Sequence, residues 1–378
     1  MAASSFRFAP PDFEIPAPAR WVLRWALGPS PEVAGTPGEG DEVASWARAL
    51  GLAPRLAHRI GDSGLAGLLG DAAGSLVAER HRALVGAMRV QDLLPVLGEV
   101  SAETGRPIVL LKGAALLAAG HAAAGSRRLT DLDALVPAQA AGGIVTGLLS
   151  RGFSQAAPDE TTHHLPPLAH PELGVVEIHT SVPGISTPDG PPSAEGLVAC
   201  GRCAPSGEPG VYTPPRSFLR AHAAVHGLAQ HGLSPTVYPL LRVVGDLLDL
   251  GIESELEEPG GDPSAVGEPW VRITALSARE TRAVAHLARE LGLGRLPEPA
   301  GDAGALLRHA IAGVADPAYH RSLGIAAACR ALARGNWRKL ARGLVTRKRP
   351  GAVISSTGPR LEALHRASTL AVVRAALR

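Results

Sequence analysis

Residues 108–136 read IVLLKGAALLAAGHAAAGSRRLTDLDALV, and this stretch decides the fold of the chain. It opens with four apolar residues, two of them β-branched, which predict a short buried strand. Gly113 interrupts that strand, and the alanine-rich residues 114–125 favour a short helix. Residues 129–136 predict a second strand, which a proline ends. Strand, helix and strand in direct succession indicate a mixed α/β unit.

The second predicted strand carries two aspartates, Asp131 and Asp133, separated by Leu132. Alternate residues of a strand project to the same side, so the two carboxylates share one face while Leu132 points into the core. Two carboxylates this close repel each other, and both resist burial unless a positive group lies between them. Oxygen ligands of this kind select Mg²⁺ or Mn²⁺. The pair therefore predicts a divalent metal site.

Further elements extend the unit on both sides. Downstream, a helix is expected at 138–150, a strand around 163–165 and another strand at 175–179. Upstream, the apolar spacing from Asp41 to Glu103 is helical, and beyond residue 216 the pattern is helical almost to the end. The expected fold class is therefore α+β, with a small mixed β-sheet core flanked by helical N- and C-terminal regions.

Glu177 supplies a third carboxylate on the expected strand at 175–179, where Val176 and Ile178 flank it. If this strand neighbours the one that carries Asp131 and Asp133, the three carboxylates form a cluster able to hold two metal ions. Such a cluster serves in-line displacement at phosphorus. Glu177 would then be the candidate for activating the attacking oxygen.

Three motifs occur in order: LLKGAAL, RRLTDLDALV and VVEIHTSV. Together they resemble the uncharacterised nucleotidyltransferase group of the DNA polymerase β-like superfamily, over roughly residues 75–255. The resemblance implies a Mg²⁺- or Mn²⁺-dependent enzyme that moves a nucleoside monophosphate from an NTP to an acceptor hydroxyl. It identifies Asp131, Asp133 and Glu177 as catalytic and metal-binding residues, and it includes a helical segment with Asp246.

The resemblance also implies which residues contact the nucleotide. Gly113 matches a turn whose backbone lies near the phosphates, and Lys112 and Arg128 stand where positive groups steady the triphosphate. The superfamily favours Gly-Ser or Gly-Gly at the turn, whereas this chain has Gly113-Ala114, so a hydroxyl contact is missing. An alternative therefore stays open: a catalytically inactive nucleotidyltransferase-like module that binds a nucleotide, RNA or a protein partner.

Composition suggests four regions along the chain. An irregular lead-in and helical region at 1–100 precedes the nucleotidyltransferase-like catalytic core at 101–185. Residues 186–215, rich in Pro and Gly, are expected to form a linker or long loop. A helical region with a basic tail occupies 216–378.

The tail contains four arginines at four-residue spacing, which places them on one helical face: Arg330, Arg334, Arg338 and Arg342. Such a face could contact RNA phosphates or an anionic surface, and it could equally be a solvated face packed on its own domain. The acceptor could be a small molecule, a peptide or RNA.

The remaining composition is that of an ordinary globular protein, with 46% hydrophobic and 19% charged residues. Three cysteines give no disulfide framework, and no signal peptide or transmembrane segment is expected, so we expect a cytoplasmic protein. The sequence contains no P-loop, no G-x-G-x-x-G after a strand and no G-x-S-x-G elbow, which argues against those enzyme classes.

Overall fold

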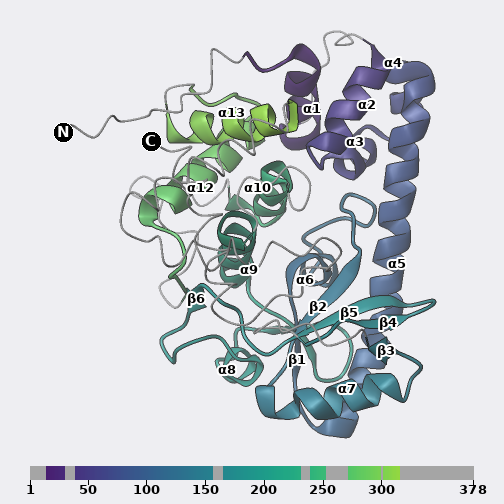
Figure 1. Cartoon of the computed structure of the whole chain (residues 1–378), viewed down its shortest axis with the longest axis vertical. Coiled ribbons are helices and arrows are strands. Elements are labelled where there is room, and N and C mark those ends of the chain that lie inside the picture. Colours follow the sequence, from purple (N-terminus) through teal and green to yellow (C-terminus); the bar gives the residue numbers. More distant parts are fainter. Residues whose placement is uncertain are drawn as a thin grey trace, which may run out of the picture.

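The computed structural model of the 378-residue chain describes residues 14–29, 39–155, 165–230, 239–252, 271–298 and 301–315. A mixed sheet forms one half of the molecule and a group of helices forms the other (Figure 1). The long helix α5 (Ala73–Thr104) runs along both halves and connects them. The α+β fold class expected from the sequence is confirmed.

The main sheet has seven strands in the order β3-β4-β5-β2-β1-β8-β7. Strand β2 occupies its centre, between an antiparallel β1 and a parallel β5. The strand bounds are β1 (Ile108–Leu110), β2 (Asp131–Leu135), β3 (Ser154–Gln155), β4 (Leu168–His170), β5 (Gly174–His179), β7 (Ala204–Pro205) and β8 (Val211–Thr213). A separate pair, β6 (Ile185–Ser186) and β9 (Arg272–Ile273), is antiparallel.

Apolar residues of the central strands make the core of this half. Ile108 and Leu110 of β1, Leu132 of β2 and Ile178 of β5 are fully buried. They pack with α5, with α6 (Lys112–Ala118) and with α7 (Ala141–Leu149), which follows the short 3₁₀ turn η2 (Ala138–Ala140). The central strands therefore lie where the sequence places them, and burial holds them there.

Residues 186–215 differ from the linker or long loop expected from their composition. They contain α8 (Ala194–Ala199) and the strands β7 and β8. Strand β8 pairs in parallel with β1, with Val211 opposite Ile108. Because Val211 is fully buried, this segment contributes to the sheet and to its core.

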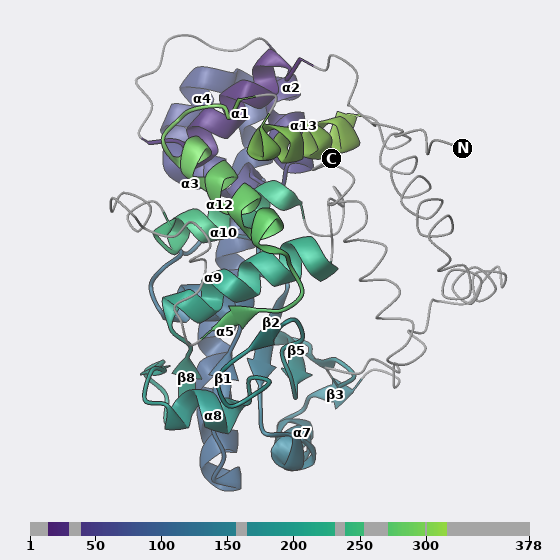
Figure 2. The ribbon, with the colours of Figure 1, turned by 90° about the vertical axis from the view of Figure 1, so that its left-hand side faces the viewer.

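The helical regions at the two ends of the sequence share a single core. Leu23 and Leu56 from the N-terminal helices pack in one cluster with Val244, Leu287 and Ile311 from the C-terminal helices. Figure 2 shows α12 and α13 beside α1. The helices are α1 (Ala17–Leu27), α2 (Gly40–Ala49), α3 (Ala53–Ile60), α4 (Asp62–Leu69), η1 (Gly70–Ala72), α9 (Arg216–Ala224), the π-helical η3 (Val225–Gln230), α10 (Leu240–Asp249), α12 (Ala278–Gly292) and α13 (Asp302–Ala315).

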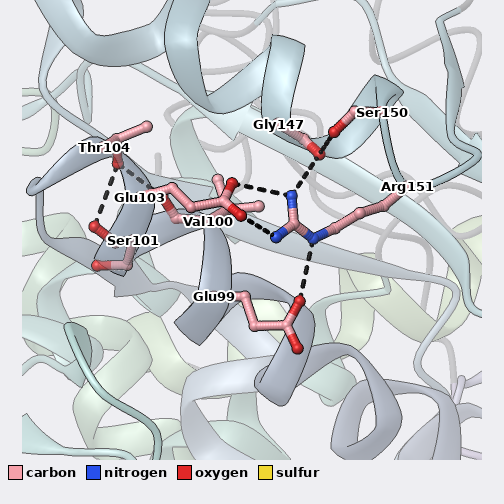
Figure 3. Close-up of polar contacts among 8 residues, drawn as sticks. All are labelled: Glu99, Val100, Ser101, Glu103, Thr104, Gly147, Ser150 and Arg151. Carbon is pink, nitrogen blue, oxygen red and sulfur yellow. Dashed lines mark hydrogen bonds and ion pairs between the residues drawn. The ribbon is translucent and has the colours of Figure 1, made fainter.

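An arginine fixes α7 to α5 at the surface (Figure 3). The Nη2 and Nη1 atoms of Arg151 donate to the two carboxylate oxygens of Glu103 at 2.6 and 3.0 Å, and Nε donates to Glu99 at 3.1 Å. Arg151 also donates to the carbonyl oxygen of Gly147. We call Arg151, Glu99 and Glu103 the surface cluster.

Two expected elements fall at or beyond the limits of the described residues. The arginines expected to line one face of the basic tail, Arg330 to Arg342, lie outside them. The strand expected around 163–165 lies outside them except for its last residue. Within the described part of the chain, no helix has the length and apolar character needed to cross a membrane.

Candidate active site

The pairing of β2 with β5 brings two acidic side chains together. In the parallel register Asp133 lies opposite Glu177, and His179 lies opposite Leu135, two residues further along each strand. The condition set by the sequence, that the strand of Glu177 neighbours the strand of the aspartate pair, is therefore met.

Asp133 is buried, and one of its oxygens has two close polar partners. Lys112 Nζ lies 2.6 Å and His179 Nε2 lies 2.8 Å from its Oδ1. Burial alone would raise the pKa of Asp133, but the positive charge of Lys112 and the contact with His179 hold that pKa well below its usual range. Asp133 is thus an ionised carboxylate in the interior of the protein.

The pKa of Glu177 is shifted in the opposite direction. Its side chain is half-buried, and its Oε2 lies 3.9 Å from His179 Nε2. Burial and then the negative charge of Asp133 raise the pKa of Glu177. Two neighbouring carboxylates therefore differ in proton affinity, because the closest contacts of Lys112 and His179 are with Asp133.

The donor set at this point suits a divalent cation. One ligand atom each from Asp133, Glu177 and His179 lies within 4.8 Å of the other two. Two carboxylates and an imidazole match the preferences of Mn²⁺ and related ions, and the carboxylates alone match Mg²⁺. This group is therefore a candidate metal site.

Asp131 lies at the first position of β2 and stands outside this three-residue group. It is half-buried, and its Oδ1 accepts a hydrogen bond from the Thr130 hydroxyl at 3.1 Å. Its negative charge nevertheless contributes to raising the pKa of Glu177. Of the three predicted carboxylates, the structure groups Asp133 with Glu177 and leaves Asp131 outside the group, two residues before Asp133 on β2.

Lys112 reaches Asp133 through an unusual backbone conformation. Its φ is 48°, a positive value found at no other non-glycine residue in the described part of the chain. Left-handed backbone at such a residue carries strain, and strain of this kind gathers at functional sites. Lys112 begins α6 directly after β1, so the strained turn aims its ammonium group back at the neighbouring strand.

A buried arginine explains why a glycine occupies position 113. A side-chain carbon at this position would clash with the guanidinium of Arg127 and with the side chain of Leu129. Arg127 is itself fixed by Asp246 of α10, to which it donates from Nε at 2.8 Å and from Nη2 at 2.9 Å. The turn is therefore covered by a buried, bidentate ion pair.

Two adjacent arginines precede β2, and the sequence pointed to Arg128 as the one near the phosphates while Arg127 was missed. Arg128 is exposed, whereas Arg127 is buried against Gly113. One signal in the sequence could have pointed to Arg127. Alternate residues share a face, and counting back from Asp133 and Asp131 in steps of two reaches Leu129 and then Arg127.

The resemblance includes a helical segment with Asp246 and leaves the role of this residue open. In the structure it is buried and bound to Arg127. Because Arg127 covers the turn beside Lys112, Asp246 ties the helical part of the chain to the candidate site.

The buried histidines of the helical part pack against one another. The rings of His222 and His226 lie 6.0 Å apart, centre to centre, and His222 lies equally far from Phe218. The cavity between these histidines, Lys112 and Asp246 measures about 10 Å³, which is the space of one water molecule. These histidines therefore pack the interior behind Lys112, and the cavity that they line is too small for a substrate.

A family model described as an uncharacterised nucleotidyltransferase matches residues 36–250. This span is more than half of the chain and contains Lys112, β2 and β5. The chain belongs to this nucleotidyltransferase family. No curated protein and no solved structure matches it.

The nucleotidyltransferase match starts before α2 and ends just after α10. It therefore includes helices of the other half of the molecule as well as the strands of the candidate site. The Arg127–Asp246 pair joins these two parts within the matched span.

Proposed function

We propose that this chain transfers a nucleoside monophosphate from an NTP to an acceptor hydroxyl and depends on a divalent metal ion. The observation that carries the proposal is the placement of Asp133 beside Glu177 on adjacent parallel strands, with Asp131 two residues before Asp133. Family membership supports the reaction class, and the donor set of Asp133, Glu177 and His179 supports the metal.

In this reaction the acceptor oxygen attacks the α-phosphorus of the NTP, and a new phosphorus–oxygen bond forms. The bond to the bridging oxygen of the β-phosphate breaks, and pyrophosphate leaves with the electron pair. The acceptor hydroxyl must lose its proton, and Glu177 is the candidate to accept it. A bound Mg²⁺ or Mn²⁺ would supply positive charge to the phosphate oxygens and orient the two reacting groups.

The chain's own residues would bind the metal ion and orient the nucleotide through their positions and charges. We assign metal binding to Asp131, Asp133 and Glu177, and we assign contact with the nucleotide phosphates to Lys112 and Arg128, with the backbone at Gly113. Lys112 is close enough to exchange between Asp133 and a phosphate oxygen, because its ammonium already lies in the site. Preorganised positive charge of this kind lowers the barrier to phosphoryl transfer.

The experiment is a transfer assay with each of four α-labelled NTPs, Mg²⁺ or Mn²⁺, and a cell extract as the source of acceptor. We expect label to move to an acceptor with the unchanged protein and to stay on the nucleotide with Glu177→Gln or without metal. The matched control is Glu208→Gln, which lies between β7 and β8 at one edge of the sheet. Equal transfer by unchanged protein and a double Asp131→Ala/Asp133→Ala variant would refute the assignment.

A second candidate is a module of the same family that binds nucleotide without transferring it. Two observations favour it: the missing hydroxyl at Gly113-Ala114, and the ion pair in which Lys112 occupies the Asp133 oxygen that a metal would need. Calorimetry with an NTP and Mg²⁺ separates the candidates when combined with the transfer assay. Binding without any labelled product in any extract would favour the module.

RNA remains one of the proposed acceptors or partners because of the arginines at 330, 334, 338 and 342. Neutralised RNA phosphates release counterions, so RNA binding through these residues should weaken steeply as salt rises. RNA binding that is insensitive to salt would contradict this part of the proposal.

A further inference from the structure

A cavity of about 380 Å³ lies between the N-terminal helices and α10, and neither Asp133 nor Glu177 lines it. Its wall includes residues around the α2–α3 turn, the segment at 126–130 and one face of α10. The volume falls within the range of small-molecule binding sites, which begins at roughly 300 Å³. Thr130 lines the cavity and directly precedes Asp131, so the cavity lies beside the start of β2.

The charge of the wall is positive. Five arginines face three carboxylates among the described residues that line it: Arg48, Arg55, Arg127, Arg128 and Arg242 against Glu79, Asp246 and Asp249. An anion is the ligand that this excess of positive charge attracts, and a cation is repelled.

Two of these arginines form a fixed frame. Arg55 binds Asp249 through two nitrogens, at 2.8 and 2.7 Å, and also donates to the carbonyl oxygen of Ala26. Arg127 binds Asp246 in the same bidentate manner. These two pairs neutralise the aspartates of α10 and hold the wall rigid, so the positive excess comes from the other arginines.

Arg48 and Arg242 lie outside this frame, and each donates a hydrogen bond to a neutral group. Arg48 Nη1 donates to the hydroxyl of Ser75 at 2.8 Å, and Arg242 Nη2 donates to the carbonyl oxygen of Arg128 at 2.6 Å. The neutral hydroxyl of Ser75 orients the Arg48 guanidinium and leaves its charge intact. The planar guanidinium of Arg48 then presents its remaining donors in the fork that fits phosphate oxygens.

We propose that this cavity adjoins the candidate active site and binds an anion, holding a phosphate group through Arg48 together with Arg128. Arg242 acts as a positioning residue, because its hydrogen bond fixes the backbone of Arg128. The phosphate belongs either to the NTP or to a phosphorylated acceptor. Because the proposed transfer reaction also uses Arg128, this inference rests in part on the proposed function, whereas the binding of an anion itself needs neither a metal ion nor catalysis.

The experiment is calorimetric titration of the full chain with pyrophosphate in excess EDTA. We expect binding by the unchanged protein and a dissociation constant at least about tenfold weaker in Arg48→Gln and in Arg128→Gln, since each loses a charge-assisted contact. Arg128→Lys keeps the charge and should recover part of the affinity. Circular dichroism checks that each variant is folded.

Two controls separate this site from the candidate active site. Arg279→Gln removes one positive charge from an exposed position on α12 and should leave the affinity unchanged. Asp133→Asn should abolish nucleotidyl transfer and leave pyrophosphate binding intact. Loss of pyrophosphate binding in Asp133→Asn but not in Arg48→Gln, or no binding by the unchanged protein, would overturn the proposal.

Competition then identifies the source of the phosphate. Displacement of pyrophosphate by an NTP but not by a sugar monophosphate would assign the cavity to the donor nucleotide. Displacement by the sugar monophosphate would assign it to a phosphorylated acceptor. Displacement by sulfate or chloride at the same concentrations as by pyrophosphate would show a nonspecific basic surface and would overturn the proposal.

Discussion

Two groups of charged residues in this molecule use the same chemistry in opposite surroundings. In the surface cluster, Arg151 binds Glu103 through two nitrogens between α5 and α7 (Figure 3). In the interior, Arg127 binds Asp246 through two nitrogens, next to the pair of Lys112 and Asp133. We call these four residues, of which Lys112 is partly exposed, the buried cluster.

The difference lies in what happens when a partner is removed. Water replaces a lost partner at the surface, so exposed ion pairs contribute little to stability. In the interior, a charge that loses its partner keeps the full cost of its burial. We therefore propose a functional role for the buried group of charges next to the candidate metal site, while the surface cluster fastens one helix to another.

The largest difference between the clusters should appear in catalysis. We expect Asp133→Asn to reduce nucleotidyl transfer by at least about a thousandfold, because metal-assisted charge stabilisation contributes several kcal/mol. Glu103→Gln should leave the rate unchanged. The measurement is the initial rate with labelled NTP, and equal rates for the two variants would remove the functional distinction between the clusters.

Stability should separate the clusters next. Asp246→Ala leaves the Arg127 guanidinium buried without this carboxylate, which should lower the free energy of unfolding by about 3–5 kcal/mol. The matched change at the surface is Glu103→Ala, for which we expect a much smaller shift of the denaturation midpoint. Urea titration followed by circular dichroism measures both. Similar midpoints would mean that the interior pair is hydrated.

The pH dependence of stability provides a third comparison, between a buried histidine and the surface cluster. Burial, and to a lesser extent Arg308, lowers the pKa of His309 on α13 from 6.5 to about 4. The folded protein favours neutral His309, so this residue's full contribution to the free energy of unfolding is present above pH 6.5. As the pH falls from 6.5 to about 4 that contribution is lost, and the loss amounts to at most about 3 kcal/mol.

Glu103 behaves differently, because its hydrogen bonds with Arg151 lower its pKa from 4.5. The contribution of the Glu103–Arg151 ion pair to stability is present above pH 4.5 and is lost only below that pH. Urea midpoints between pH 7 and 4.5 should therefore fall less steeply in His309→Gln than in the unchanged protein, while the midpoints of Arg151→Gln should run parallel to those of the unchanged protein. If the urea midpoint fell equally steeply with pH in all three proteins, His309 would be excluded as the cause of the loss of stability.

A smaller effect is expected at the glycine beside the buried cluster. Gly113→Ala should cost about 1–3 kcal/mol, because the added methyl group displaces the Arg127 guanidinium and Leu129. In the background of Arg127→Ala the same change should cost less, since one of the two obstructing groups is gone. Additive costs in this double-mutant cycle would contradict the contact.

The smallest effect is expected for Arg151→Gln. This change removes the surface cluster, and its denaturation midpoint should shift by only a small fraction of the shift for Asp246→Ala. The control is Arg82→Gln on α5, because Arg82 is exposed and forms an ion pair with Glu79 on the same helix. A shift for Arg151→Gln as large as that for Asp246→Ala would show that the surface cluster contributes as much to stability as the buried ion pair.

The sequence predicted the elements that alternation and periodicity encode. The apolar run at 108–111 and the alternating residues of β2 and β5 are strong signals, and burial in the structure agrees with them. Strand β8 was missed, because its three residues are surrounded by Pro and Gly and because only its pairing with β1 makes it a strand. Pairing between distant segments is a tertiary property that local composition does not carry.

The same limit applies to the candidate site. The acidic residues could be chosen from the sequence, since isolated carboxylates on buried strands are rare. Their grouping depends on the register of β2 against β5 and on side-chain reach, which is why Asp131 stands apart while His179 contacts Asp133. Arg127 and Arg128 look alike in the sequence, and only the structure shows that Arg127 is buried and Arg128 is exposed.

The shared helical core has a consequence for how the chain can be divided. The family match covers residues 36–250, yet Leu23 lies before it and Leu287 and Ile311 lie after it, all in one core with residues inside it. A fragment cut at the limits of the match would expose the apolar faces that these residues cover. The evolutionary unit recognised in the sequence is thus smaller than the unit that packs as one core, and the flanking helices complete it.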